Sequence, residues 1–191
     1  VEGFTLRDAV IGISFTGLWS EARNNIIYDV EVGISAFGAE GWIEGNRISN
    51  PSDRGVQGNG ASLWLDENVI EGAAQGVDLV ASNARILGGE LLDNVRGVSL
   101  QDSFANLAEV RFEGNQTAVM LSLGDVAVQG NQFVDNIVGI YLVDSPARVL
   151  DNNFEANGYA MVTEFSTPVV TANHFHGSTI EAISEGIGSA S

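Results

Sequence analysis

The chain has 191 residues, a formal net charge of −17, no cysteine and a hydrophobic content of 45%. That hydrophobic content excludes a disordered acidic tail, because disorder requires low hydrophobicity together with high net charge. The eight basic residues are all arginine and form no basic run, which argues against a nucleic-acid partner. No apolar stretch approaches the roughly 20 residues of a membrane-spanning helix, so we expect no membrane insertion.

A small residue followed by an aliphatic one recurs along the chain at a nearly constant spacing of 21 residues. One extra residue, near positions 50–53, interrupts the register. The repeats begin at Gly12, Gly33, Gly55, Gly76, Gly97, Ala118, Gly139, Ala160 and Glu181. A fixed period of this length over a whole chain is the signature of a solenoid, in which each repeat packs on its neighbours.

Counting forward from each repeat start gives columns of chemically similar residues. The column fifteen residues on is wholly apolar: Leu6, Ile27, Ile48, Ile70, Leu91, Phe112, Phe133, Phe154 and Phe175. The column thirteen residues on holds Asn25, Asn46, Asn68, Asn131, Asn152 and Asn173, interrupted by Phe4, Gly89 and Val110. These columns and those at offsets one, three and ten contain no charged residue. They must point inward, because burying an unpaired charge is costly.

Each 21-residue unit holds three short apolar stretches separated by Gly or Asn, too little for a strand and a helix with loops of usual length. We predict an all-β fold, a right-handed single-stranded parallel β-helix of about nine coils with three short strands per coil. The β-helix domain covers residues 1–180, and residues 181–191 form the last partial coil and a C-terminal tail. A leucine-rich repeat is the competing fold, but its motif has an aliphatic residue where this chain has Asn.

The columns also predict how the coils hold together. Phe112, Phe133, Phe154 and Phe175 should form an aromatic stack in the core. The Asn column should lie at a turn, where Asn tolerates left-handed backbone and its amide can bond the coils on either side.

One pattern, Asn-x-Phe/Ile-x-x-Asn-x-x-Gly-Ile/Val-x-Leu, runs from Asn131 to Leu142, and the chain opens with Glu2-Gly3-Phe4-Thr5-Leu6. Both resemble the pectin-lyase-like β-helix repeats of carbohydrate-binding proteins and sugar hydrolases, which NosD-type periplasmic proteins share. The resemblance covers nearly the whole chain and implies extracellular, cell-surface or periplasmic localisation. It does not choose an activity, because the fold hosts lyases, hydrolases, epimerases, phage tailspikes and scaffold domains.

The three tryptophans are candidates for ligand binding. Trp42 and Trp64 occupy one outward column on adjacent coils, and Trp19 lies two columns away on the coil before. Exposed indoles suit a polysaccharide, because sugar C–H faces pack on aromatic rings. The alternative is that they pack under a loop, against a missing N-terminal segment or in an oligomer contact.

Two further groups have the chemistry of metal ligands. His174 and His176 lie on one face of a strand with Glu155 one coil below, which suits a transition metal or a general base. The alternative is a pair of surface histidines. An acidic face could hold Ca²⁺ or could simply be solvated, and we expect no other cofactor. Its members are Asp66, Glu67, Glu71, Glu90, Asp93, Glu109, Glu113, Asp135, Asp151 and Glu155, with Arg47 and Arg111 among them.

A catalytic site would use Asp78, Arg96 and Asp102, which fall on neighbouring coils but in different columns. The resemblance to pectate lyases implies an Arg base beside acidic residues. The chain lacks the Gly-His-Gly and Arg-Ile-Lys of polygalacturonases and the Asp-Pro-His of alginate epimerases. The alternative is that all three are surface charges.

The leading prediction is therefore a non-catalytic β-helix module of a secreted or surface protein that binds polysaccharide along Trp19, Trp42 and Trp64. A polysaccharide lyase, glycoside hydrolase or epimerase is the first alternative, and a structural spacer or self-assembling scaffold is the second. An uncapped coil exposes unpaired backbone groups, so flanking domains of a longer chain or head-to-tail association are also expected.

Overall fold

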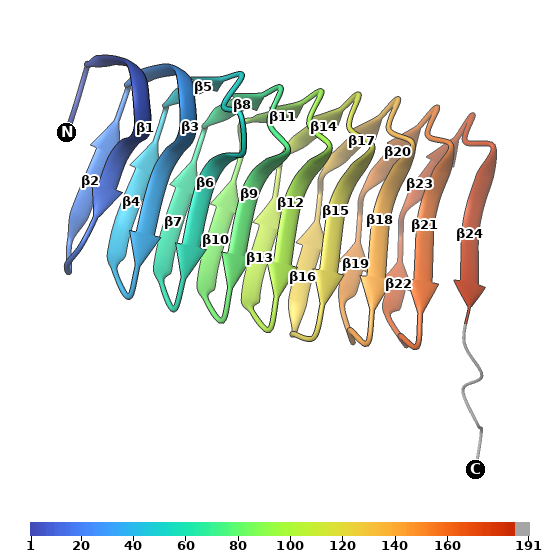
Figure 1. The fold of residues 1–191 in the computed structure, drawn as a ribbon. Helices are drawn as coiled ribbons and strands as arrows, with labels where there is room; N and C mark the ends of the chain where they lie inside the picture. The colour runs from blue at the N-terminus through green and yellow to red at the C-terminus, as the bar shows by residue number, and fades with distance from the viewer. Residues whose placement is uncertain (186–191) are drawn as a thin grey trace.

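The computed structural model describes residues 1–185, which form parallel strands wound into a solenoid whose coils follow one another in chain order (Figure 1). Every strand pairing among these residues is parallel and joins residues about one repeat apart, such as Leu91 with Phe112 and Phe133 with Phe154. No helix long and apolar enough to span a membrane occurs in this part of the chain. The predicted all-β parallel β-helix is confirmed.

The coils present three faces. The short-strand face carries three-residue strands: β5 (Arg47–Ser49), β8 (Val69–Glu71), β11 (Glu90–Leu92), β14 (Arg111–Glu113), β17 (Gln132–Val134), β20 (Asn153–Glu155) and β23 (His174–His176). The long-strand face carries six-residue strands: β6 (Arg54–Asn59), β9 (Gln75–Val80), β12 (Arg96–Gln101), β15 (Thr117–Ser122), β18 (Val138–Val143), β21 (Tyr159–Glu164) and β24 (Ile180–Glu185).

The third face is an eight-stranded sheet. Its strands are β2 (Ser20–Arg23), β4 (Glu40–Glu44), β7 (Ser62–Asp66), β10 (Asn83–Leu87), β13 (Phe104–Ala108), β16 (Val126–Gln129), β19 (Arg148–Leu150) and β22 (Val169–Thr171). These eight strands mark eight turns, and β24 begins the next, against about nine coils expected. The boundary predicted after residue 180 falls within β24, and residues 186–191 of the predicted tail lie outside the described residues.

In the first two coils the short-strand and long-strand faces are continuous. The strands β1 (Thr5–Phe15) and β3 (Ile26–Phe37) each run along both faces, so that β5 pairs with the first part of β3 and β6 with its second part. The extra residue near 50–53 separates β5 from β6, and Asn50 there has a left-handed φ of 49°. The sequence insertion therefore marks the point where one long strand becomes two.

The predicted phenylalanine stack fills the core behind the short-strand face. Phe112, Phe133, Phe154 and Phe175 follow one another in register, and their ring centroids are 5.0, 4.6 and 5.0 Å apart. The planes of successive rings deviate by at most 12°. The first three rings are fully buried, so this column supplies much of the hydrophobic stabilisation of the later coils.

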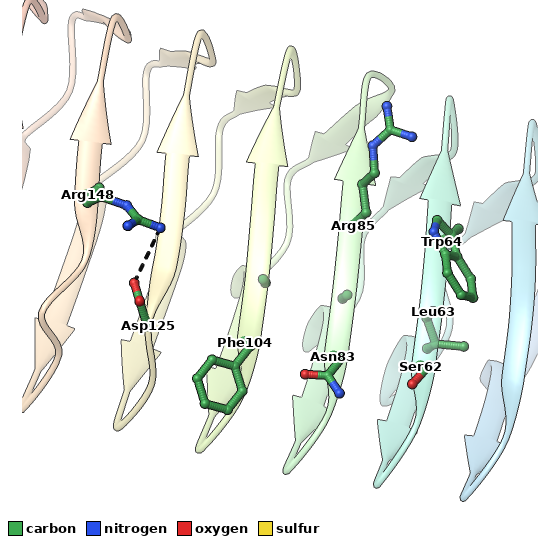
Figure 2. A pocket seen from close by; sticks show the side chains of 10 residues that line it. Ser62, Leu63, Trp64, Asn83, Arg85, Phe104, Asp125 and Arg148 are labelled. Carbon is green, nitrogen blue, oxygen red and sulfur yellow. Dashed lines mark ion pairs between the residues drawn. The ribbon is translucent and has the colours of Figure 1, made fainter.

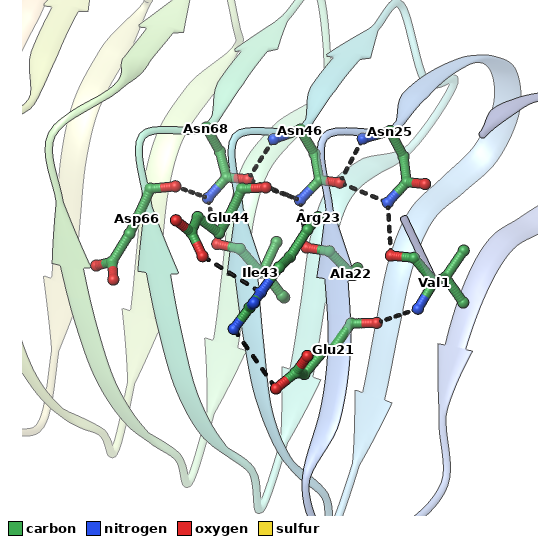
Figure 3. Close-up of polar contacts among 10 residues, drawn as sticks. All are labelled: Val1, Glu21, Ala22, Arg23, Asn25, Ile43, Glu44, Asn46, Asp66 and Asn68. Atoms are coloured by element: carbon green, nitrogen blue, oxygen red, sulfur yellow. Dashed lines mark hydrogen bonds and ion pairs between the residues drawn. The ribbon is translucent and has the colours of Figure 1, made fainter. Parts of the chain in front are cut away.

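The predicted asparagine ladder is also present. The side-chain oxygen of Asn46 accepts hydrogen bonds from the backbone and side-chain nitrogens of Asn25, at 3.0 and 2.8 Å, and Asn68 does the same for Asn46 (Figure 3). The expectation that these asparagines adopt the left-handed conformation is wrong. The preceding residues do so, among them Asn24 and Glu67, because the asparagine must direct its amide inward to reach the next coil.

A second ladder, which the columns above do not include, lies at the other end of the short strands. Asn94, Asn115, Asn136 and Asn157 are bonded in the same way: the side-chain oxygens of the last three accept from the asparagine one coil earlier, and that of Asn94 accepts from the backbone nitrogen of Ala73. All four are buried. Together the two ladders satisfy backbone N–H groups that would otherwise be buried without partners at the corners of the prism.

Candidate functional site

The three tryptophans form one continuous stack on the outer side of the eight-stranded sheet. Trp42 and Trp64 sit at the centres of β4 and β7 and are paired in register, with ring centroids 4.7 Å apart and planes 16° apart. Trp19, whose φ is 61°, precedes β2 and reaches back to Trp42, at 5.5 Å and 18°. The strand register puts Glu21, not Trp19, beside Trp42, so the left-handed turn is what brings Trp19 into the stack.

Stacking restricts what the indoles can offer a ligand. Both faces of the Trp42 ring are covered, one by Trp19 and the other by Trp64, so a ligand can contact only its edge. Trp19 is 67% exposed at one end of the stack. At the other end, the face of Trp64 that does not meet Trp42 is directed along the solenoid toward the next coil. The exposed indoles expected from the sequence are therefore one stack, with Trp19 at one end and Trp64 at the other.

A groove of about 470 Å³ begins at the Trp64 end of this stack. It runs along the eight-stranded sheet over β7, β10, β13, β16 and β19 (Figure 2). Its walls include Trp64, Arg85, Phe104, Asp125 and Arg148. Its lining also includes Ala84 and Ala105, which are partly buried and pack against the core. We call this feature the sheet groove.

Two arginines give the sheet groove positive charge in a chain of net charge −17. Arg148 faces Asp125 across 3.6 Å, and both side chains are about half exposed, so this pair is loosely held. Arg85 has no ion-pair or hydrogen-bond partner for its guanidinium among the described side chains of residues 1–180. Six of the other seven arginines do have carboxylate partners there: Arg7, Arg23, Arg47, Arg54, Arg111 and Arg148.

The residues predicted for catalysis do not converge. Asp78 lies on β9 and accepts a hydrogen bond from Arg54 Nε at 2.7 Å. Arg96 begins β12, whereas Asp102 follows the end of the same strand. At about 3.3 Å per residue, the backbone positions of Arg96 and Asp102 are roughly 20 Å apart. The three therefore do not assemble into the predicted acid and base arrangement.

The predicted metal ligands are only partly brought together. Register pairs Glu155 with His176 and Asn153 with His174 on adjacent strands of the short-strand face, and both histidines are exposed. No group of three or more His, Asp or Glu side chains that could hold a metal ion occurs among the described side chains of residues 1–180. That statement applies equally to the acidic face, where Arg47 binds Glu71 and Arg111 binds Glu113.

The sequence columns did not reveal the sheet groove, because they select residues that repeat. The groove is built from unlike residues at equivalent outward positions: Trp64, Arg85 and Arg148 share the offset-nine column, and Phe104 and Asp125 share the offset-seven column. The sequence does contain a signal for Arg85, because Arg85 follows Trp64 directly in the offset-nine column.

Among solved structures, the A-module of the mannuronan C-5 epimerase AlgE6 from Azotobacter vinelandii is similar over 98% of this chain, with a TM-score of 0.67 and 17% identity. The chain spans 64% of that module. ORF18 of Geobacillus virus E2 has a TM-score of 0.39 at 13% identity, covering 93% of this chain and 54% of that one. The Streptococcus pneumoniae adhesin PfbA has a TM-score of 0.31 at 16% identity, covering 86% and 49%.

At 17% identity, the likeness to the epimerase module shows a shared fold alone. No curated protein sequence matches the chain. The family model described as "right handed beta helix region" matches residues 11–190. The register of the coils, the inward columns and this match together show that the chain belongs to the right-handed β-helix family.

Proposed function

We propose that this chain is a non-catalytic β-helix module that binds a polysaccharide along the outer face of the eight-stranded sheet. The observation that carries the proposal is the open face of Trp64 at the end of the sheet groove. An indole face takes the apolar side of a sugar ring, and polar groups beside it take the hydroxyls.

The shape of the groove suits a chain more than a compact ligand. Its volume of about 470 Å³ is within the ~300–1,000 Å³ usual for ligand sites. It crosses five neighbouring strands, which at ~4.8 Å per strand gives a length of about 19 Å. Ser62 and Asn83 supply hydroxyl and amide groups along one wall. Several consecutive sugar units can therefore be in contact at once.

Binding without glycoside hydrolysis is supported by the carboxylates of the groove. Glycoside hydrolysis ordinarily needs two carboxyl groups on either side of the bond to be cleaved. Among the described residues that line the groove, Asp125 is the single carboxylate, and Arg148 pairs with it. Asp78 and Asp102 belong to β9 and to the turn after β12, outside the groove.

The proposal includes a place of action outside the cytoplasm, at the cell surface or in the periplasm, where polysaccharides are met. It rests on the resemblance of the repeats to those of proteins that work there. Fractionation of the producing cells followed by immunodetection tests it, and recovery of the protein only from the cytoplasm contradicts it.

Affinity gel electrophoresis with a panel of neutral and acidic polysaccharides tests binding. We expect the wild-type chain to be retarded by at least one polymer and Trp64→Ala to lose most of that retardation. Phe165→Ala is the matched control, because Phe165 is a 70% exposed aromatic residue that does not line the groove. Absence of retardation by every polymer, or equal retardation of Trp64→Ala and wild type, refutes the proposal.

Catalysis is tested on the same panel. Each polymer is incubated with the protein, with and without Ca²⁺, and unsaturated products are followed by absorbance and new chain ends by a reducing-end assay. Epimerisation is followed by NMR of the recovered polymer. Turnover by the wild-type protein that is absent from a heat-denatured control overturns the non-catalytic part of the proposal.

A further inference from the structure

Arg85 lines the sheet groove and forms no ion pair with a described side chain, whereas other arginines of the chain pair with a carboxylate on an adjacent coil. Arg47 on β5 donates to both carboxylate oxygens of Glu71 on β8, at 2.8 and 2.9 Å. Arg54 on β6 likewise reaches Asp78 on β9. Pairing with a carboxylate from the next coil is thus an ordinary outcome in this acidic solenoid.

At Arg85 the neighbouring coils offer different groups. Arg85 lies on β10, and its register partners on the two neighbouring strands are Trp64 on β7 and Asn106 on β13. Neither an indole nor an amide neutralises the guanidinium, and Asp66, two residues beyond Trp64 on β7, forms no ion pair with it. The next residues in the same outward column are Ala127 and Arg148, so the column carries no carboxylate from Trp64 to Arg148.

The position of this free charge is specific. Arg85 lines the sheet groove immediately beyond the open face of Trp64 (Figure 2). A guanidinium presents a planar set of donors that matches the two oxygens of a carboxylate or two oxygens of a sulfate. A sugar ring packed on Trp64 would hold an acidic substituent within reach of Arg85.

We infer that Arg85 and the open face of Trp64 form a subsite for an anionic sugar unit, carboxylated or sulfated. The inference rests on the proposed function and adds to it the charge of the ligand. Trp64 supplies the ring contact and Arg85 supplies the charge recognition. Arg148, three strands further on and roughly 14 Å away, provides a second cation that is partly neutralised by Asp125.

The net charge of −17 opposes an acidic polymer at long range. At about 0.15 M salt the screening length is ~8 Å, so most of this repulsion is screened while a direct contact at Arg85 is retained. At this salt concentration, tighter binding of an anionic polymer than of its neutral counterpart therefore reports the local charge of the subsite.

Isothermal titration at this ionic strength tests the subsite with three probes: a soluble polyuronate, the same polymer after reduction of its carboxyl groups, and a sulfated polysaccharide. We expect wild type to bind at least one anionic probe about tenfold more tightly than the reduced polymer, the effect of a charge-assisted pair of hydrogen bonds. The two anionic probes separate carboxylate from sulfate recognition.

Arg85→Gln should abolish this preference while keeping binding to the reduced polymer. Arg96→Gln is the matched control, because Arg96 also has no ion-pair partner within the described residues, changes the net charge equally and does not line the groove. Equal binding of anionic and reduced probes by wild type, or an equal loss in both variants, overturns the subsite and leaves the proposed function intact. Absence of binding to all three probes refutes the subsite and counts against the proposed function as well.

Discussion

The side-chain oxygen of Asn136 accepts two hydrogen bonds from Asn115 one coil earlier, from its backbone nitrogen at 2.9 Å and its side-chain nitrogen at 3.0 Å. The Asn136 side-chain nitrogen in turn donates to Asn157 and to the backbone oxygen of Phe112. One buried amide therefore joins three coils and satisfies a backbone N–H at the turn. The corners of this solenoid are held by side chains as much as by the strand ladders.

Replacing Asn136 with Ala should lower the free energy of unfolding by about 3 kcal/mol, because a buried N–H of Asn115 and a buried carbonyl of Phe112 lose their partners. Urea titration followed by circular dichroism measures the change. Asn153→Ala is the control: Asn153 is exposed, its side chain makes no hydrogen bond among residues 1–180, and its loss should cost less than about 0.5 kcal/mol. If Asn136→Ala lowered the free energy of unfolding no more than Asn153→Ala does, the second ladder would not contribute to stability.

Disrupting the phenylalanine stack should lower the free energy of unfolding by a comparable amount, through the loss of packing and not of hydrogen bonds. Phe133 is fully buried between Phe112 and Phe154. Phe133→Ala should destabilise the chain by roughly 3–5 kcal/mol, because it removes apolar contacts and leaves a cavity. Phe165→Ala, at a 70% exposed position, should change stability by less than about 0.5 kcal/mol. A shift of similar size in both variants would contradict the assignment of Phe133 to the core.

The fold was predictable because repetition multiplies a weak local signal. A single Ile48 or Phe154 does not reveal a β-helix, but an uncharged column at every repeat does, since each coil must bury the same side. The second ladder was equally present in the sequence, as four asparagines 21 residues apart. Its asparagines occupy a column other than the five compared above, which is why those columns do not show it.

The candidate site was less predictable because it depends on differences between coils. Trp42 and Trp64 share a column and were paired correctly, whereas Trp19 enters the stack only through its left-handed turn. The sheet groove is lined by unlike residues on successive coils, and Arg85 is identified by two properties together: it lines the groove, and it forms no ion pair with a described side chain. Neither property is expressed in a single column.

Gly89 takes the place of an asparagine in the first ladder, and its substitution tests why a glycine is needed there. Its φ is +79°, and a Cβ there would collide with the backbone of Asn68. We expect Gly89→Ala to cost about 3 kcal/mol, the sum of left-handed strain and steric overlap. Gly130→Ala, with φ +67° and free space around the new Cβ, should cost only about 1 kcal/mol. Gly17→Ala, with free space and no such φ, should stay within about 0.5 kcal/mol. Any other order in urea titrations would contradict this account.

The ion pairs of Arg54 and Arg47 should differ in strength because they differ in burial. The side chains of Arg54 and Asp78 are 26% and 14% exposed, against 52% and 28% for Arg47 and Glu71. Arg54→Gln leaves a largely buried carboxylate without its cation and should cost roughly 1–2 kcal/mol, whereas Arg47→Gln should cost less than about 0.5 kcal/mol. Both substitutions change the net charge from −17 by one unit, so the general repulsion of the acidic chain cancels in the comparison.

Salt separates the two further: the Arg47 effect should vanish by about 0.5 M NaCl, while most of the Arg54 effect should persist because buried pairs are weakly screened. If both effects disappear together as salt is added, Arg54 makes only a surface contact and Asp78 is not held in place by it.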